Sequence, residues 1–232
     1  MDLYRVKIGS VEHIIPIILA VIIAVVIVKL AKSKSNTIKE RISFLLSLFV
    51  SLVVIVFHLK KALFDSYSIQ EDLPLYLCSL LAILIPVYTY CRRFWMFEVL
   101  VFWIIVGTLQ GVITPDIEIG FPSFDYFRYW IVHLGLLVII SYEIIVFKLR
   151  PKWRSVLKSF LAFQVYVAII FGLNKVLNSN YGYLNQKPKS TSILDYLGDW
   201  PYYVFKADVI LLVAFIVVFL IFKASEVKLF SK

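Results

Sequence analysis

ILAVIIAVVIVKL, at residues 18–30, is an apolar run interrupted only by a lysine close to its end. A second run, ADVILLVAFIVVFLIF at residues 207–222, contains only one charged residue, an aspartate near its start. A helix needs about 20 apolar residues to cross the hydrocarbon core of a bilayer, whereas the strands of a membrane barrel alternate between polar and apolar residues. Neither run alternates, so the sequence predicts an all-α, polytopic membrane protein.

Other apolar runs of similar length fill most of the chain. Of its 232 residues 61% are hydrophobic, which is more than a soluble domain can keep away from water. We therefore expect residues 1–232 to form one domain of seven transmembrane helices, the first of them a retained helix rather than a signal peptide. The predicted spans lie at about residues 12–30, 41–60, 73–90, 94–114, 126–148, 156–175 and 202–222.

Basic residues gather on one side of this predicted bundle. The net charge is +9, and lysines and arginines are typical of the cytoplasmic connections of membrane proteins. The amino terminus should then lie outside and the carboxyl terminus in the cytoplasm, with the basic face touching anionic lipid head groups. The basic residues of this side are Lys29, Lys32, Lys34, Lys39, Arg41, Arg92, Arg93, Lys148, Arg150, Lys152, Arg154, Lys158, Lys223, Lys228 and Lys232.

Two candidate reactive residues are predicted at a similar depth below the outer surface. EDLPLYLC, at residues 71–78, should place Pro74, Tyr76 and Cys78 on the first turns of the third helix. FRYWIVHLGLL, at residues 127–137, carries His133 in the fifth helix. Ionisable groups inside a membrane span are costly and usually face the interior of the bundle.

The polar residues of the spans and their outer connections are distributed unevenly between the two halves of the membrane. A transporter is expected to offer polar groups near the midplane, whereas this distribution indicates a pocket open to the outer leaflet. The loop at residues 176–201 is rich in aromatic and apolar residues, and we expect it to fold over that pocket. The outer half holds Glu12, His13, Tyr76, Cys78, Gln110, Asp116, Tyr129, His133, Asn180, Tyr181, Lys187 and Asp208, and the inner half holds Glu98, Glu143 and Gln164.

These residue types suit a lipid acyltransferase or a lipid hydrolase that forms a thioester, with a Cys–His pair in the outer-leaflet pocket. A thiol becomes a good nucleophile when an imidazole takes its proton, so Cys78 is the candidate nucleophile and His133 the candidate base. Gln110, Tyr129 and Asn180 are candidate donors to an oxyanion, and the chemistry calls for no metal or cofactor. The expected substrate-binding residues are His13, Tyr76, Gln110, Asp116, Tyr129, Asn180, Tyr181, Lys187 and Trp200.

Two other functions fit the same sequence. Buried cysteines most often pack as small hydrophobes, so the pocket could bind or sense a lipid without catalysis. A small-solute or proton-coupled transporter, using Glu98, Glu143 and His133, is the third interpretation.

Five segments together resemble the YwaF-type family of bacterial integral membrane proteins, which is distantly related to eukaryotic transmembrane protein 164. They are Glu12-His13, LPLYLC at 73–78, GVITPDIEIGFPSFDYFRYWIVH at 111–133, NYGYLNQKP at 180–188 and LGDWPYY at 197–203.

The resemblance implies a multi-pass protein of the bacterial plasma membrane whose partners are membrane lipids, not nucleic acid. It also implies an acyltransferase-type cysteine and histidine, which act on phospholipids, including ether lipids, in the eukaryotic relatives. These two residues correspond to Cys78 and His133, while Tyr76 stands where many relatives have histidine.

Overall fold

The computed structural model describes residues 5–188 and 192–230, and within these ranges the regular structure is entirely helical. Six helical segments are long and apolar enough to cross a membrane, which confirms a multi-pass helical membrane protein. They are α1 (Val11–Lys32), α2 (Asn36–Phe64), the continuous segment Phe94–Ile113, α6 (Phe124–Val146), α7 (Trp153–Leu177) and α8 (Tyr202–Phe230), which meets the criterion over Tyr202–Ser225.

The third expected span differs from the prediction. Helix α3 covers only Leu77–Cys91, 15 residues, or about 22 Å of rise against the roughly 30 Å of a hydrocarbon core. Pro74 and Tyr76 therefore do not lie on its first turns, and Tyr76 is the extended residue that precedes the helix. The expected count of seven full-length spans is not confirmed.

Hydrogen bonds from distant segments explain why the chain before α3 is not helical. The Leu73 N–H donates to the Tyr181 hydroxyl at 2.9 Å, and the Tyr166 hydroxyl donates to the Leu75 carbonyl at 2.8 Å. Proline at position 74 has no N–H to donate. Non-helical backbone near membrane depth is tolerated where protein groups satisfy it, so this connection enters the bundle as an irregular segment.

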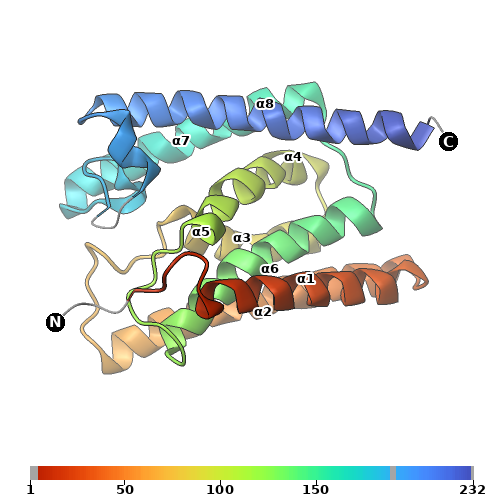
Figure 1. Ribbon diagram of the computed structural model, residues 1–232, viewed down its shortest axis with the longest axis horizontal. Coiled ribbons are helices and arrows are strands. Elements are labelled where there is room, and N and C mark those ends of the chain that lie inside the picture. The colour runs from red at the N-terminus through yellow and green to blue at the C-terminus, as the bar shows by residue number, and fades with distance from the viewer. Residues whose placement is uncertain (1–4, 189–191, 231–232) are drawn as a thin grey trace.

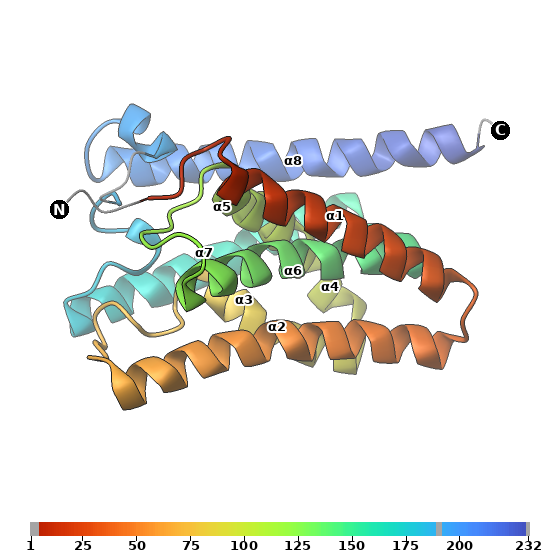
Figure 2. The same cartoon turned by 60° about the horizontal axis from the view of Figure 1, so that its bottom comes forward.

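The helices form two groups joined by the segment Phe94–Ile113. Helices α1 and α2 pack on α6, and α3 packs on α2, while α7 packs on both α4 (Phe94–Phe102) and α8. In Figure 1 α7 and α8 form the upper layer, α1, α2 and α6 form the lower one, and α4 lies between them. Figure 2, turned by 60°, shows α3 and α4 behind α2 and α6.

Small residues allow the helices of the lower layer to approach closely. Ser43, Ser47 and Ser51 are buried on one face of α2, and the Ser47 hydroxyl lies 2.6 Å from that of Thr89. A Cβ at Gly135 would lie 2.5 Å from a methyl group of Val50. Close backbone approach and hydroxyl hydrogen bonds are typical of helix contacts in membranes.

Both glutamates of the predicted inner half have cationic partners. Glu143 is fully buried and accepts from Ser43 at 2.5 Å, Tyr88 at 2.8 Å and Arg92 at 2.7 Å. Glu98 accepts from the Ser155 hydroxyl at 2.6 Å and from the Lys158 ammonium group at 2.7 Å. These carboxylates are therefore held in ion pairs where the helices meet.

Gln164 and Asp208 were expected in opposite halves of the bundle. The Gln164 amide in fact donates to the Asp208 carboxylate at 2.7 Å, so the two side chains lie at one level between α7 and α8. The prediction assigned each residue to a half of the membrane by its distance in sequence from the end of its helix. That distance is too coarse to separate residues that lie near the middle of the bundle.

Candidate functional site

The candidate site is built on a wide helical turn. The π-helix η1 (Trp103–Thr108) separates α4 from the short α5 (Leu109–Ile113), and such single π turns are frequent at functional sites. Gly107 and Gly111 lie four residues apart and so share one face of this segment. We call this surface the glycine face.

Helices α3 and α6 both pack against the glycine face. A Cβ at Gly107 would lie 2.7 Å from Cδ2 of Leu77, the first residue of α3. A Cβ at Gly111 would lie 2.6 Å from Cδ2 and 2.7 Å from Nε2 of His133 in α6. The start of α3 and the imidazole of His133 are therefore about one helical turn apart along the same surface.

Cys78 follows Leu77 in the first turn of α3 and is half-buried. Its thiol lies beside the hydroxyl of Thr108, the last residue of the π-helix. Thr108 is fully buried, and its hydroxyl has no partner that meets hydrogen-bond geometry. The thiol is also close enough to the phenols of Tyr129, Tyr166 and Tyr183 to interact with them electrostatically.

His133 is oriented so that Nε2 is the basic nitrogen of its neutral ring. Nδ1 lies 2.8 Å from the Tyr129 carbonyl, and because a carbonyl only accepts, Nδ1 must carry the hydrogen. Among the described residues no hydrogen bond uses Nε2. The ring is thus held by one nitrogen, and the lone pair of the other nitrogen is not used within the described residues.

Tyr129 holds both the imidazole and the connection after α5. Its ring stacks on that of His133, with centroids 4.0 Å apart. Its hydroxyl donates to the Gly111 carbonyl at 2.7 Å and accepts from the Asp116 N–H at 3.3 Å. Asp116 itself is ion-paired with Arg5 at 2.7 Å, so Tyr129 positions His133 and Asp116 faces outward to the amino-terminal segment.

Within the part of the chain that the structure describes, no hydrogen bond joins the Cys78 thiol to the His133 imidazole. Both groups border the glycine face, with Thr108 beside the sulfur. Proton transfer between them therefore needs a side-chain movement or a bound molecule that closes the remaining gap.

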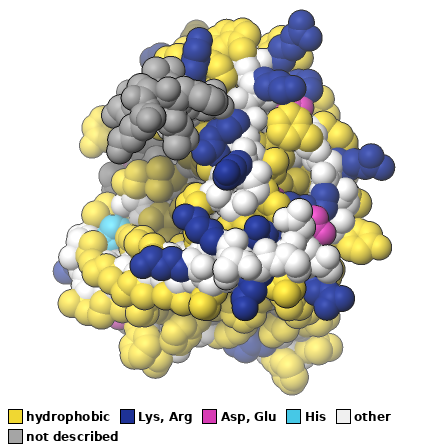
Figure 3. All heavy atoms as spheres, turned by 90° about the vertical axis from the view of Figure 1, so that its right-hand side faces the viewer, with side chains coloured by type: hydrophobic (Ala, Val, Ile, Leu, Met, Phe, Trp, Pro, Cys, Tyr) yellow, Lys and Arg dark blue, Asp and Glu magenta, His cyan; other side chains and the backbone are white. Residues whose placement is uncertain are grey.

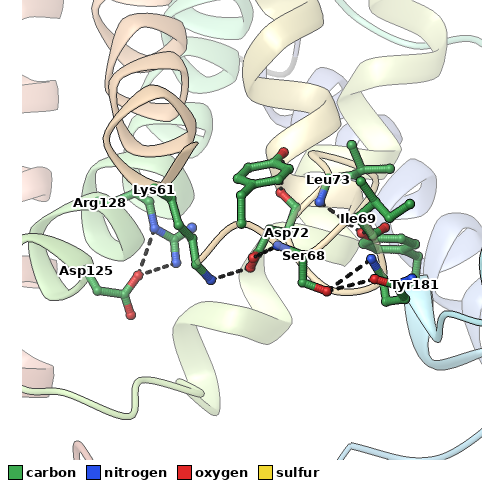
Figure 4. Close-up of polar contacts among 10 residues, drawn as sticks. Lys61, Ser68, Ile69, Asp72, Leu73, Asp125, Arg128 and Tyr181 are labelled. Atoms are coloured by element: carbon green, nitrogen blue, oxygen red, sulfur yellow. Dashed lines mark hydrogen bonds and ion pairs between the residues drawn. The ribbon is translucent and has the colours of Figure 1, made fainter. Parts of the chain in front are cut away.

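Tyr181 attaches the loop after α7 to the connection before α3. Its hydroxyl donates to the Ile69 carbonyl at 2.8 Å and accepts from the Leu73 N–H (Figure 4). Its own N–H and carbonyl are both bonded to the Asn174 side chain, at 2.8 and 2.9 Å. The turn η2 (Tyr181–Tyr183) is consequently fixed against the segment that leads to Cys78.

Tyr76 lies between this turn and Cys78. Its ring makes contacts with Tyr181 and Tyr183, at centroid distances of 5.2 and 5.7 Å. Burial raises the pKa of the Tyr76 phenol, and the neighbouring Tyr183 and Tyr181 raise it further. The hydroxyl thus stays protonated, and no described residue accepts its hydrogen.

Four other expected substrate-binding residues have partners of their own at the margins. His13 accepts from the Gly9 N–H at 2.8 Å through Nδ1 and reaches the Val112 carbonyl at 2.8 Å through Nε2. Asn180 bonds to Asn185 and Gln186 within its loop, and the Trp200 indole donates to the Leu184 carbonyl at 3.1 Å. The Lys187 ammonium group lies 5.7 Å from the ring centroid of Tyr203.

Gln110 is exposed on α5 and donates to the Thr114 hydroxyl at 2.9 Å. The structure thus brings together Tyr76, Cys78, Tyr129, His133 and Tyr181, but not His13, Gln110, Asn180, Lys187 and Trp200. Substrate binding by these residues remains a prediction.

Sequence reasoning missed Gly107, Thr108 and Gly111. The stretch GTLQG at residues 107–111 has the spacing of small residues that favours close helix contacts, and this signal could have revealed the glycine face. It also missed the polar group in Figure 4, in which Lys61 of α2 pairs with Asp72, and Arg128 of α6 pairs with Asp125 at 2.6 Å. Among the described residues, no cluster of three or more His, Cys, Asp or Glu could hold a metal ion.

The fold and the site define a multi-pass helical membrane protein with polar and aromatic residues gathered at one end of its bundle. The model of the TMEM164 family matches residues 8–219, so the chain belongs to the TMEM164 family. Neither the curated proteins nor the solved structures contain a significant match. The narrower YwaF-type assignment stays a prediction.

Proposed function

We propose that this protein transfers acyl chains from phospholipids, with Cys78 as nucleophile and His133 as general base. The observation that carries the proposal is the position of the imidazole. Its Nδ1 is held by a carbonyl, its Nε2 is unbonded, and its ring borders the same glycine face as the start of α3. The chain belongs to the TMEM164 family, and the resemblance described from the sequence, which implies an acyltransferase-type cysteine and histidine, supports the proposal.

The first half-reaction would form a thioester. Nε2 of His133 takes the thiol proton of Cys78, and the sulfur attacks the carbonyl carbon of the lipid ester. As the carbon–sulfur bond forms, the bond to the glycerol oxygen breaks, and His133 returns the proton to that oxygen. The products are an acylated Cys78 and a lysophospholipid.

The second half-reaction would release the acyl chain. A hydroxyl group of a lipid acceptor, or water, attacks the thioester carbon while Nε2 of His133 takes its proton. The carbon–sulfur bond breaks, and the proton passes to the sulfur. Tyr76, two residues before Cys78, is a candidate donor to the oxyanion in both steps, because no described residue accepts a hydrogen bond from its hydroxyl.

Closure of the gap between sulfur and imidazole is part of this mechanism. The thiol now lies beside Thr108, so the mechanism requires that rotation about the Cα–Cβ bond of Cys78 bring the sulfur within reach of the imidazole. A lipid ester bound there would then meet the nucleophile and the base together.

We also propose that α3 crosses the membrane as a short seventh helix, with the amino terminus outside a bacterial plasma membrane. The connection before α3 enters the bundle from the end opposite Arg92 and the basic segments, and protein groups satisfy its backbone. Membrane-impermeant thiol reagents applied to intact cells should therefore spare Cys91, at the carboxyl end of α3. Rapid labelling of Cys91 from outside would refute this orientation.

The catalytic proposal is tested by trapping the thioester. Purified protein incubated with a phospholipid carrying a labelled acyl chain should acquire hydroxylamine-sensitive label. Cys78→Ala should abolish the label, and His133→Ala should slow its appearance by about 10²–10⁴-fold. The control is Cys91→Ala, which removes the exposed cysteine and should have no effect. Equal labelling of Cys78→Ala and the unmodified protein would exclude the mechanism.

Lipid binding without catalysis is the second candidate, and the missing hydrogen bond between Cys78 and His133 favours it. In that case a copurifying lipid should survive Cys78→Ser, and no thioester should form. The transporter interpretation has less support, because Glu98 and Glu143 are ion-paired with Lys158 and Arg92.

A further inference from the structure

A second lipid site is indicated at the opposite end of the bundle, away from Cys78. A cavity of about 220 Å³ opens between α8 and the end of α6, and its lining is almost entirely apolar. It extends from the π-helix η1 to the segment that joins α6 to α7. The lining residues include Ile105, Ile144, Arg150, Val218, Ile221 and Phe222.

Arg150 is held at this cavity with part of its guanidinium group unused. Its Nη1 donates to the carbonyls of Ile144 and Leu149, at 2.7 and 2.8 Å. The guanidinium carbon lies 5.9 Å from the ring centroid of Phe222. No hydrogen bond to a described residue uses Nε or Nη2, so these donors remain for an anionic group, and a planar guanidinium matches phosphate well.

The surroundings of the cavity are basic. The segment between α6 and α7 also carries Lys148 and Lys152, and Figure 3 shows Lys and Arg side chains gathered over this end of the molecule. The two buried carboxylates of this end, Glu98 and Glu143, already have cationic partners. The local charge therefore favours a negatively charged ligand.

We propose that this cavity holds part of one acyl chain of an anionic phospholipid from the leaflet at the basic end, with the lipid phosphate bound by Arg150. The apolar lining excludes a free phosphate ion as the complete ligand, because an ion would leave the apolar walls unfilled. A chain with an anionic head group matches both parts of the site. The site does not involve Cys78 or His133, so it does not depend on the proposed catalysis.

The test measures thermal unfolding of the detergent-purified protein during titration with phosphatidylglycerol. The midpoint should rise saturably, as for a ligand that binds the folded state. Phosphatidylcholine should act only at much higher concentration, and inorganic phosphate should have no effect. Arg150→Gln should weaken the apparent affinity for phosphatidylglycerol about tenfold or more.

Two further variants separate the cavity from general charge attraction. Arg154→Gln removes an exposed arginine of the same end and should leave the affinity unchanged. Val218→Phe should fill the cavity and weaken binding while Arg150 stays in place, which also covers the case in which Arg150→Gln fails to fold. The proposal is overturned if both lipids bind alike, if Arg154→Gln costs as much as Arg150→Gln, or if Val218→Phe binds normally.

Discussion

The two ends of the bundle treat their buried polar groups in opposite ways. At the basic end Glu98 and Glu143 each accept from a cation and from at least one hydroxyl group. Towards the other end, several buried polar atoms of the described residues have no partner, although each such atom costs about 1–3 kcal/mol. They are Ser10 Oγ, His58 Nδ1, Thr108 Oγ1 and Trp130 Nε1.

We interpret this difference as separating an end with a structural role from the end at which we propose the reaction. Polar groups that are fully bonded within the protein add rigidity but have little capacity left for a ligand. The hydroxyl of Thr108, which has only the Cys78 thiol beside it, and the unbonded Nε2 of His133 retain that capacity. The comparison predicts that substitutions at the basic end mainly change stability and that substitutions around the glycine face mainly change activity.

The largest expected effect is at the basic end, in Arg92→Met. This change leaves the carboxylate of Glu143 fully buried without its cation, and breaking a buried ion pair in this way costs about 3–5 kcal/mol. Thermal unfolding in detergent measures the loss. The double variant Arg92→Met with Glu143→Leu should recover part of it, because no uncompensated charge remains, although the hydroxyls of Ser43 and Tyr88 lose their acceptor.

Lys158→Met is the matched control for that experiment. The Lys158 side chain is 53% exposed, whereas that of Glu98 is 4% exposed. Water can replace part of the interaction that Lys158 makes, so its loss should cost less than that of Arg92. If Arg92→Met were as mild as Lys158→Met, the basic end would not have the structural role assigned to it.

At the glycine face, Gly111→Ala should move the His133 ring. The added Cβ would lie within 2.7 Å of two ring atoms, and such overpacking costs about 1–3 kcal/mol. Labelling of Cys78 by an acyl donor should slow more than this stability loss alone explains, since the base is displaced. Normal labelling kinetics in a folded Gly111→Ala protein would contradict the role of the glycine face.

Tyr181→Phe should loosen the connection before α3. The substitution removes one acceptor and one donor and leaves Leu73 N–H and the Ile69 carbonyl unpaired, at a cost of about 1–2 kcal/mol. Hydrogen exchange of residues 66–77 should become faster. Tyr196→Phe, at a ring that is 83% exposed, should change neither quantity.

The smallest effect is expected for Gly172→Ala in α7. No atom lies within 4 Å of the added Cβ, and alanine is favoured over glycine in a helix by about 0.8–1 kcal/mol. The free energy of unfolding should therefore rise slightly, with no change in labelling. A loss of stability in Gly172→Ala would show that Gly172 of α7 is as sensitive to an added methyl group as Gly111 of α5, contrary to their contacts.

Hydropathy was sufficient to predict the helical class and the six long spans, because length and apolar composition determine whether a helix can cross a bilayer. It failed at LPLYLC, since the phenols of Tyr166, 91 positions from Leu75, and of Tyr181, 108 positions from Leu73, satisfy that backbone in place of a helix. The position of a residue along its predicted span gives its depth in the membrane but not which neighbouring helix its side chain faces. It could not show that His133 borders Gly111 or that Cys78 lies beside Thr108.

The number of residues in the π-helix η1 determines which side of α5 faces His133, so an insertion or deletion in η1 would not be tolerated. Each residue added to or removed from Trp103–Thr108 would swing the following α5 by about 100° around its axis. Either Gln110 or Val112 would then meet the imidazole in place of Gly111. An insertion or deletion here, although it alters no reactive side chain, would rotate a bulky residue into a surface that accommodates only hydrogen.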